Sequence, residues 1–227
     1  MCIRDRQWPP KPPANWSQRS VLPEASDADA PAPVLVLACG ALGADIRAIV
    51  SANGWDHVDF EYLPAHFHNR PEKITPAIEA VLVERADNYE SILIGYGDCG
   101  TGGHLDRLLN RFPHAQRLPG DHCYAFFTGV ERFLAEHASE IGTLYLTDYL
   151  VKHQEPLLFG ALGLTEHPEL TEMYFGNYTR LLYIAQAPTP ELTESAKSCA
   201  NRLNLEFDQL DVGRGVLETR LLEVRVA

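Results

Sequence analysis

The sequence is short of basic residues. It has 19 lysines and arginines against 31 aspartates and glutamates, which gives a formal net charge of −12 at pH 7. Binding to nucleic acid or to an anionic membrane surface depends on clustered basic side chains that neutralise phosphates. Long apolar runs are missing as well, and none approaches the roughly 20 residues of a membrane span. The composition therefore argues against nucleic acid and membrane as partners.

Cysteine is also scarce, with five residues in a chain of 227. That is too few, and too scattered, for a disulfide scaffold in a chain of this length. The sequence does not open on the basic-then-apolar pattern of a secretory signal peptide. We therefore expect a cytoplasmic protein whose cysteines are free thiols or metal ligands.

Two nucleotide-binding signatures are absent or weak. A phosphate-binding loop needs G-K-[ST], which the sequence does not contain. Gly95, Gly97 and Gly100 partly mimic G-x-G-x-x-G, but a dinucleotide site would place that motif in the first strand-to-helix turn, with an acidic residue after the next strand. Neither signature supports a nucleotide-binding function.

Residues 1–33 differ from the rest of the chain. They hold seven of the 16 prolines and show no periodic apolar pattern, which is typical of a disordered leader. The opening "MCIRDR" resembles a translated sequencing-adapter artefact, so we assign no role to Cys2. Residues 34–227 are expected to form the α/β domain.

Apolar runs alternate with helical patterns along residues 34–227. "VLVLACG" and "SILIGYG" are continuous apolar runs of the kind buried on both faces of a parallel sheet. The alternation predicts an α/β protein with a mainly parallel sheet flanked by helices, Rossmann-like, with residues 147–171 as the candidate start of a second lobe. Expected strands are 34–40, 58–64, 91–97, a short one within 115–123, 142–150, 178–186 and one or two within 205–224. The expected helices include 44–54, 71–87, 104–112, 124–138 and 190–204.

Three cysteines occupy equivalent places at strand-to-helix junctions. Cys39 ends the first apolar run, Cys99 follows "ILIGYGD", and Cys123 follows the loop "PGDH". Loops at the carboxyl ends of neighbouring parallel strands converge on one crevice, where ligands bind. Helix N-termini at such an edge are expected to lower thiol pKa values. Cys199 lies within a predicted helix and is assigned to packing only.

The richest glycine loop, "GYGDCGTGGH", surrounds Cys99 with polar groups. Asp98 and His104 are candidate catalytic residues, because a carboxylate and an imidazole can orient a ligand or move a proton. Gly97, Gly100 and Gly102 are candidate cofactor-binding positions. A backbone without Cβ atoms can approach a ligand closely there.

Histidines supply candidates for a fourth metal ligand. His122 is adjacent to Cys123, and His104 opens the helix after the glycine loop. His66 and His68 alternate in "PAHFHNRPEK" and share a face, which is a metal-binding pattern but also suits a polar loop.

Five segments together resemble a known family. "VLACGALGADI", "IGYGDCGTG", "PGDHCYAFFTGVERF", "GTLYLTDYLV" and "NYTRLLYIA" stand in the order found in domain of unknown function 1638, over about residues 34–226. The family pattern carries cysteines matching Cys39, Cys99 and Cys123, with an acidic residue or histidine before the third, here Asp121 and His122. Its members occur in bacteria and archaea, often encoded near corrinoid-dependent methyltransferase systems. The resemblance implies a role in methyl-group or one-carbon metabolism, with a corrinoid protein or methyltransferase as partner. The ending "DVGRGVLETRLLEV" departs from the more proline-rich end of the family.

The first functional hypothesis is a metal-binding protein. Cys39, Cys99 and Cys123 would be thiolate ligands, with the fourth position open or taken by His122 or His104. Zinc suits a set of three cysteines with or without histidine. An iron–sulfur cluster with one open iron is the rival metal chemistry.

Two alternatives need no metal. In the first, Cys39 and Cys99 form the cysteine pair of a cofactor-free enzyme. This arrangement resembles aspartate/glutamate racemases, in which two cysteines lie on opposite sides of a small-molecule substrate. Asp98 or His122 would then tune the thiols. In the second, the protein is a non-catalytic partner or chaperone of a corrinoid protein.

Overall fold

The computed structural model describes residues 32–226, without the side chains at 139 and 224–226. The predicted leader, residues 1–33, lies outside the described residues except for its last two positions. Within the described part, strands and helices alternate, and every strand pair is parallel. The predicted α/β class is confirmed, with two sheets in place of one.

Sheet A is built from the first four strands. They are β1 (Val34–Cys39), β2 (Val58–Leu63), β3 (Ser91–Gly95) and β4 (Ala115–Arg117), in the order β2-β1-β3-β4. The two central strands, β1 and β3, are buried on both faces, as their continuous apolar runs predict.

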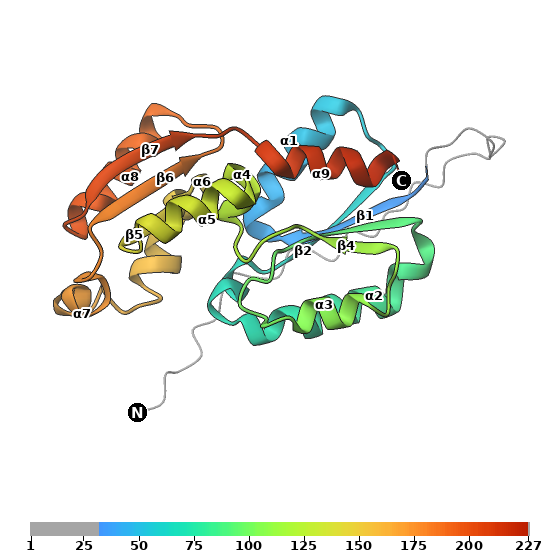
Figure 1. The fold of residues 1–227 in the computed structure, drawn as a ribbon, viewed down its shortest axis with the longest axis horizontal. Helices are drawn as coiled ribbons and strands as arrows, with labels where there is room; N and C mark the ends of the chain where they lie inside the picture. Colours follow the sequence, from blue (N-terminus) through green and yellow to red (C-terminus); the bar gives the residue numbers. More distant parts are fainter. Residues whose placement is uncertain (1–31, 227) are drawn as a thin grey trace. The chain divides into compact units, whose positions relative to one another are not determined.

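Helices cover both faces of sheet A (Figure 1). The α1 (Gly43–Asn53) and α9 (Gly215–Val226) helices pack on the face that presents Val36 and Ala38. The α2 (Ile74–Arg85) and α3 (His104–Leu109) helices pack on the face that presents Leu35 and Leu37. The first helix ends where the sequence predicts, at Gly54, whose φ of 63° suits a glycine cap.

Sheet B follows, with β5 (Thr143–Thr147), β6 (Arg180–Ala185) and β7 (Glu206–Asp211) in sequential order. One face packs on α6 (Asp148–Lys152) and on α8 (Pro190–Arg202), which Pro190 opens as expected. The other face, through Tyr145 and Leu182, joins the hydrophobic cluster of α1, α4 (Tyr124–Thr128) and α9. The two sheets thus share one core cluster.

Short turns fill the connections. The 3-10 turns are η1 (Gly40–Leu42), η2 (Ala65–Asn69), η3 (Pro71–Lys73), η4 (Ala86–Asn88) and η6 (Pro168–Leu170). A π-helical turn, η5 (Glu155–Phe159), and the short α7 (Thr171–Phe175) lie between β5 and β6. Among the described helices, none is long and apolar enough to cross a membrane.

Two expectations about single elements were wrong, and a third was met in part. Residues 205–224, predicted to supply one or two strands, supply one, β7. The chain from Gly215 on forms α9, because Leu217 and Leu221 lie one helical turn apart and both enter the core. The single helix predicted over 124–138 is two helices, α4 and α5 (Val130–Ser139), since Gly129 has a φ of 86° that no helix accommodates. The strand predicted to reach residue 150 ends at Thr147, whose hydroxyl caps α6.

Candidate functional site: a pocket lined by three cysteines

Cys39, Cys99 and Cys123 reach one pocket from three different loops. Cys39 is the last residue of β1, Cys99 lies in the glycine loop after β3, and Cys123 immediately precedes α4. All three line a cavity of about 50 Å³ together with Tyr96, and we call it the thiol pocket. Sequence reasoning predicted that these cysteines meet at the carboxyl edge of the sheet. The pocket lies at the edge where β1 and β3 end.

Backbone hydrogen bonds hold the Cys99 loop against the loop that carries Cys123. The N–H of Asp98 donates to Gly120 O at 3.0 Å, and the N–H of Cys99 donates to Asp121 O at 2.8 Å. A Cβ atom at Gly97 would lie 2.6 Å from Gly120 O, so only glycine permits this approach. The position of Cys99 relative to Cys123 therefore depends on Gly97.

The backbone of Cys99 is itself unusual. Its φ is 48°, in the left-handed region that L side chains other than asparagine and aspartate rarely adopt. Such a conformation costs on the order of 1–2 kcal/mol and persists where the surroundings enforce it, often at functional sites. Here it directs the side chain into the pocket with Cys39 and Cys123.

Burial makes these thiols weak acids. It raises the pKa of Cys99 to about 12, with smaller raising effects from the charges of Cys39 and Asp98. Burial also raises the pKa of Cys39 and of Cys123, and the charges of Cys99 and Cys39 raise that of Cys123 further. The expectation that helix N-termini would lower thiol pKa values was wrong. The helix that follows Cys123 has only five residues, too few to offset desolvation.

Tyr96 is the pocket residue that sequence reasoning missed. Its side chain is 3% exposed, and its hydroxyl has no oxygen or nitrogen partner among residues 32–226. The hydroxyl lies beside the Cys39 thiol, and its hydrogen bond to that thiol offsets part of the rise that burial causes in the Cys39 pKa. Burial also raises the pKa of Tyr96 well above its usual range. Thiol sulfur is a weak hydrogen-bond partner, so a bound group with an oxygen or nitrogen atom would satisfy this buried hydroxyl better. Its position directly after a strand was the available signal.

The remaining walls come from η2 and from sheet B. His68, the second histidine of the H-x-H pair, lines the pocket, and so do Thr147, Tyr149 and Leu150 around the end of β5. Much of His68 is exposed, yet desolvation of its ring and the nearby charge of His122 lower its pKa. A lowered pKa keeps this imidazole neutral near pH 7, the form that binds metals.

The other predicted site residues lie elsewhere. His104 and Gly100 line a separate cavity beside η3 and the start of α2, and His122 lines a third one with His137. Gly102 has a φ of 61°, and no atom lies within 4 Å of the position that a Cβ would occupy there. Of the predicted metal ligands, the thiol pocket therefore collects the three cysteines and neither His104 nor His122.

Asp98 closes its own loop. Its carboxylate accepts hydrogen bonds from the Thr101 hydroxyl at 2.9 Å and from the N–H groups of Gly102 and Gly103 at 3.1 and 2.7 Å. Desolvation raises its pKa, but these donors and the charge of Arg117 outweigh that effect and the pKa is lowered. The carboxylate holds the shape of the loop around Cys99, and a catalytic role for Asp98 stays a prediction.

Cys99 in the metal-free, reduced protein should react slowly with iodoacetamide. With a pKa of about 12, very little thiolate is present at pH 8, and the thiolate is the nucleophile. We expect a rate at least about tenfold below that of Cys99 in the urea-unfolded chain, still rising above pH 10 where an ordinary cysteine levels off. Mass spectrometry of the labelled peptide measures both rates. Equal rates at pH 8 would show that the thiol is not buried.

A family comparison is consistent with the order of motifs in the sequence. The family described as "Protein of unknown function (DUF1638)" matches residues 62–221, a range that holds Cys99 and Cys123 and begins after Cys39. Neither a curated protein nor a solved structure matches the chain. Because the match covers well over half of the sequence, the chain belongs to the DUF1638 family.

Proposed function

We propose that this protein binds a soft metal ion of the zinc type through the thiolates of Cys39, Cys99 and Cys123. The observation that carries the proposal is the convergence of three thiols, from three separate loops, beside the buried hydroxyl of Tyr96. Thiolate sulfur binds both zinc ions and iron–sulfur clusters. With three protein ligands, a four-coordinate zinc ion keeps one position open for a small molecule.

Metal binding would require a rearrangement of the side chains. Among residues 32–226, no three Cys, His, Asp or Glu side chains already stand in the arrangement of a metal site. The thiols are protonated and uncharged in this apolar pocket, because burial and the repulsion between neighbouring thiolates raise their pKa values. A cation removes that repulsion, and rotation of the thiols would bring the sulfurs to about 2.3 Å from the ion. His68 is the pocket histidine available for the fourth position.

The pocket lining gives less support to the cysteine-pair enzyme. Cys39 and Cys99 both come from sheet A, whereas a facing pair would come from two lobes. Among the described residues that line the thiol pocket there is no lysine, arginine or carboxylate to hold the charged groups of an amino-acid substrate. The link to corrinoid-dependent methyl transfer rests on the family resemblance alone and stays a prediction.

Zinc titration tests the proposal. Anaerobically purified, reduced protein competes for Zn²⁺ with a chromophoric chelator, and the variants are Cys39→Ser, Cys99→Ser and Cys123→Ser. Each should lose at least about 100-fold in affinity, since even outer-shell changes cost 10–100-fold. Cys199→Ser is the matched control, because Cys199 is buried on α8 with its pKa also raised to about 12 but lies in a different cluster. Thermal melting confirms that each variant is folded.

Proton release gives a second readout. Each thiol gives up its proton when it becomes a ligand. Because all three pKa values are raised, binding near pH 7 should release up to one proton per thiol and become tighter as pH rises. Wild-type protein that takes up no zinc, or Cys-to-Ser variants that retain wild-type affinity, would refute the proposal. If the purified protein contains iron and sulfide, the conclusion changes: the same cysteines then bind an iron–sulfur cluster and not zinc.

A further inference from the structure

A larger cavity adjoins the thiol pocket. It has a volume of about 490 Å³, which falls in the range of about 300–1,000 Å³ typical of small-molecule sites. His68, Leu150 and Leu157 line both cavities, so the two are neighbours across these side chains. We call it the leucine cavity, after the leucines of β5, α6 and the following turns that line it: Leu144, Leu146, Leu150, Leu157, Leu158 and Leu162.

The rest of the lining is mostly polar or aromatic. This part of the lining consists of His68, Asn69 and Arg70 from the end of η2, together with Tyr124 and Tyr145. Among the described residues that line the cavity, none is acidic and Arg70 carries the only fixed charge. A positive side chain in a cavity without acidic lining residues favours an anionic ligand.

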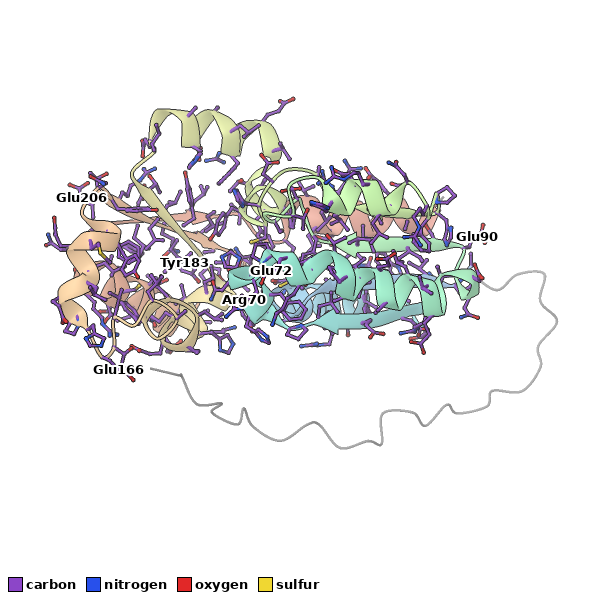
Figure 2. All side chains as sticks on the ribbon, turned by 90° about the horizontal axis from the view of Figure 1, so that it is seen from below. Arg70, Glu72, Glu90, Glu166, Tyr183 and Glu206 are labelled. Carbon is purple, nitrogen blue, oxygen red and sulfur yellow. The ribbon has the colours of Figure 1, made fainter. Side chains whose placement is uncertain are left out.

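The Arg70 guanidinium is available to a ligand. Its ion pair is with Glu72 at 4.0 Å, and both side chains are more than 60% exposed. Figure 2 labels the two residues. An exposed pair at that distance contributes little and is easily exchanged for a better partner. Arginine presents a planar set of donors that suits a carboxylate or sulfonate.

We propose that the leucine cavity binds a small organic anion with an apolar body, its anionic group on Arg70 and its body against the leucines. The body would extend toward His68 and Leu157, and so toward the thiol pocket. This proposal stands apart from metal binding, because no cysteine lines the leucine cavity among its described residues.

Two fluorescent probes with the same apolar body test the charge requirement. 1-Anilinonaphthalene-8-sulfonate carries an anionic group that N-phenyl-1-naphthylamine lacks, and both become brighter in apolar surroundings. The wild-type protein should bind the sulfonate at least about tenfold more tightly, as expected for one charge-assisted hydrogen bond. Arg70→Gln should abolish that difference without weakening the neutral probe. Lys73→Gln, which removes an exposed cation outside the cavity lining, is the matched control.

A second pair of variants tests the location. Ala161 is exposed and lines the cavity, so Ala161→Trp adds bulk there without entering the core. It should weaken both probes at least about tenfold, whereas Val83→Trp, at an exposed position on α2, should weaken neither. Cys99→Ser should bind both probes as the wild type does. The probe experiment therefore tests the anion site independently of the proposed metal site. Equal affinity of the wild type for the two probes, or unchanged binding in Ala161→Trp, would overturn the inference.

Discussion

Asp148→Ala is expected to lower the free energy of unfolding by about 3–5 kcal/mol. Asp148 is the first residue of α6 and is 7% exposed. Its Oδ1 accepts hydrogen bonds from the Tyr183 hydroxyl at 2.7 Å and from the N–H of Gln186 at 3.0 Å, and its Oδ2 accepts from the N–H of Ala187 at 2.8 Å. Alanine would leave the Tyr183 hydroxyl and the Gln186 N–H buried without an acceptor, and each such loss costs about 1–3 kcal/mol. The N–H of Ala187 is only partly buried, so water can replace its lost acceptor.

Tyr183→Phe is the matched control for this prediction. Tyr183, labelled in Figure 2, is fully buried, and the change removes one donor together with its need for an acceptor. It should therefore cost only about 1 kcal/mol. Urea unfolding followed by circular dichroism measures both variants. A cost below about 1 kcal/mol for Asp148→Ala would mean that solvent replaces the carboxylate and that the cluster is not dry.

The same cluster supports the thiol pocket from the side of sheet B. Asp148 lies between Thr147 and Tyr149, which both line the pocket, and its carboxylate joins the end of β5 to the loop after β6. We expect Asp148→Ala to loosen this wall while the cysteines on sheet A stay in place. Zinc affinity should then fall less than in the cysteine variants, because no proposed ligand is removed.

The sequence predicted best what depends on local pattern. The continuous apolar runs of β1 and β3, the Gly54 stop and the Pro190 start are each determined within a few residues, and the structure has all four. The meeting of Cys39 with Cys99 was also predictable. It follows from the rule that parallel strands carry their following loops to one edge of the sheet.

What the sequence could not supply depends on packing between distant segments. His104 is five residues from Cys99, but three glycines with positive φ intervene and direct it to a different cavity. His68 is far from every cysteine along the chain and yet lines their pocket. The thiol pKa values rise for the same reason. Desolvation is set by the surrounding walls, and those include residues of sheet B that no pattern near the cysteines reveals.

Gly97→Ala should separate the two loops that bring the cysteines together. The new methyl group would lie 2.6 Å from Gly120 O and 3.2 Å from Phe126 Cζ, and a backbone oxygen cannot move aside as a flexible side chain does. We expect a loss of about 2–3 kcal/mol in the free energy of unfolding, as for other overpacked sites. The hydrogen bonds from Asp98 and Cys99 to residues 120–121 would lengthen. Zinc affinity should fall at least about tenfold, since a shift of a few tenths of an ångström already misplaces a ligand.

Gly102→Ala, in the same loop, separates the effect of close approach from that of backbone strain. Gly102 has a φ of 61°, so alanine costs about 1 kcal/mol there, but no atom lies within 4 Å of the added Cβ. This variant should lose stability slightly and keep the zinc affinity of the wild type. Urea unfolding and the chelator titration measure both variants side by side. If Gly97→Ala also kept wild-type affinity, the contact between the two loops would serve stability alone. The metal ligands would then not depend on the distance between Cys99 and Cys123.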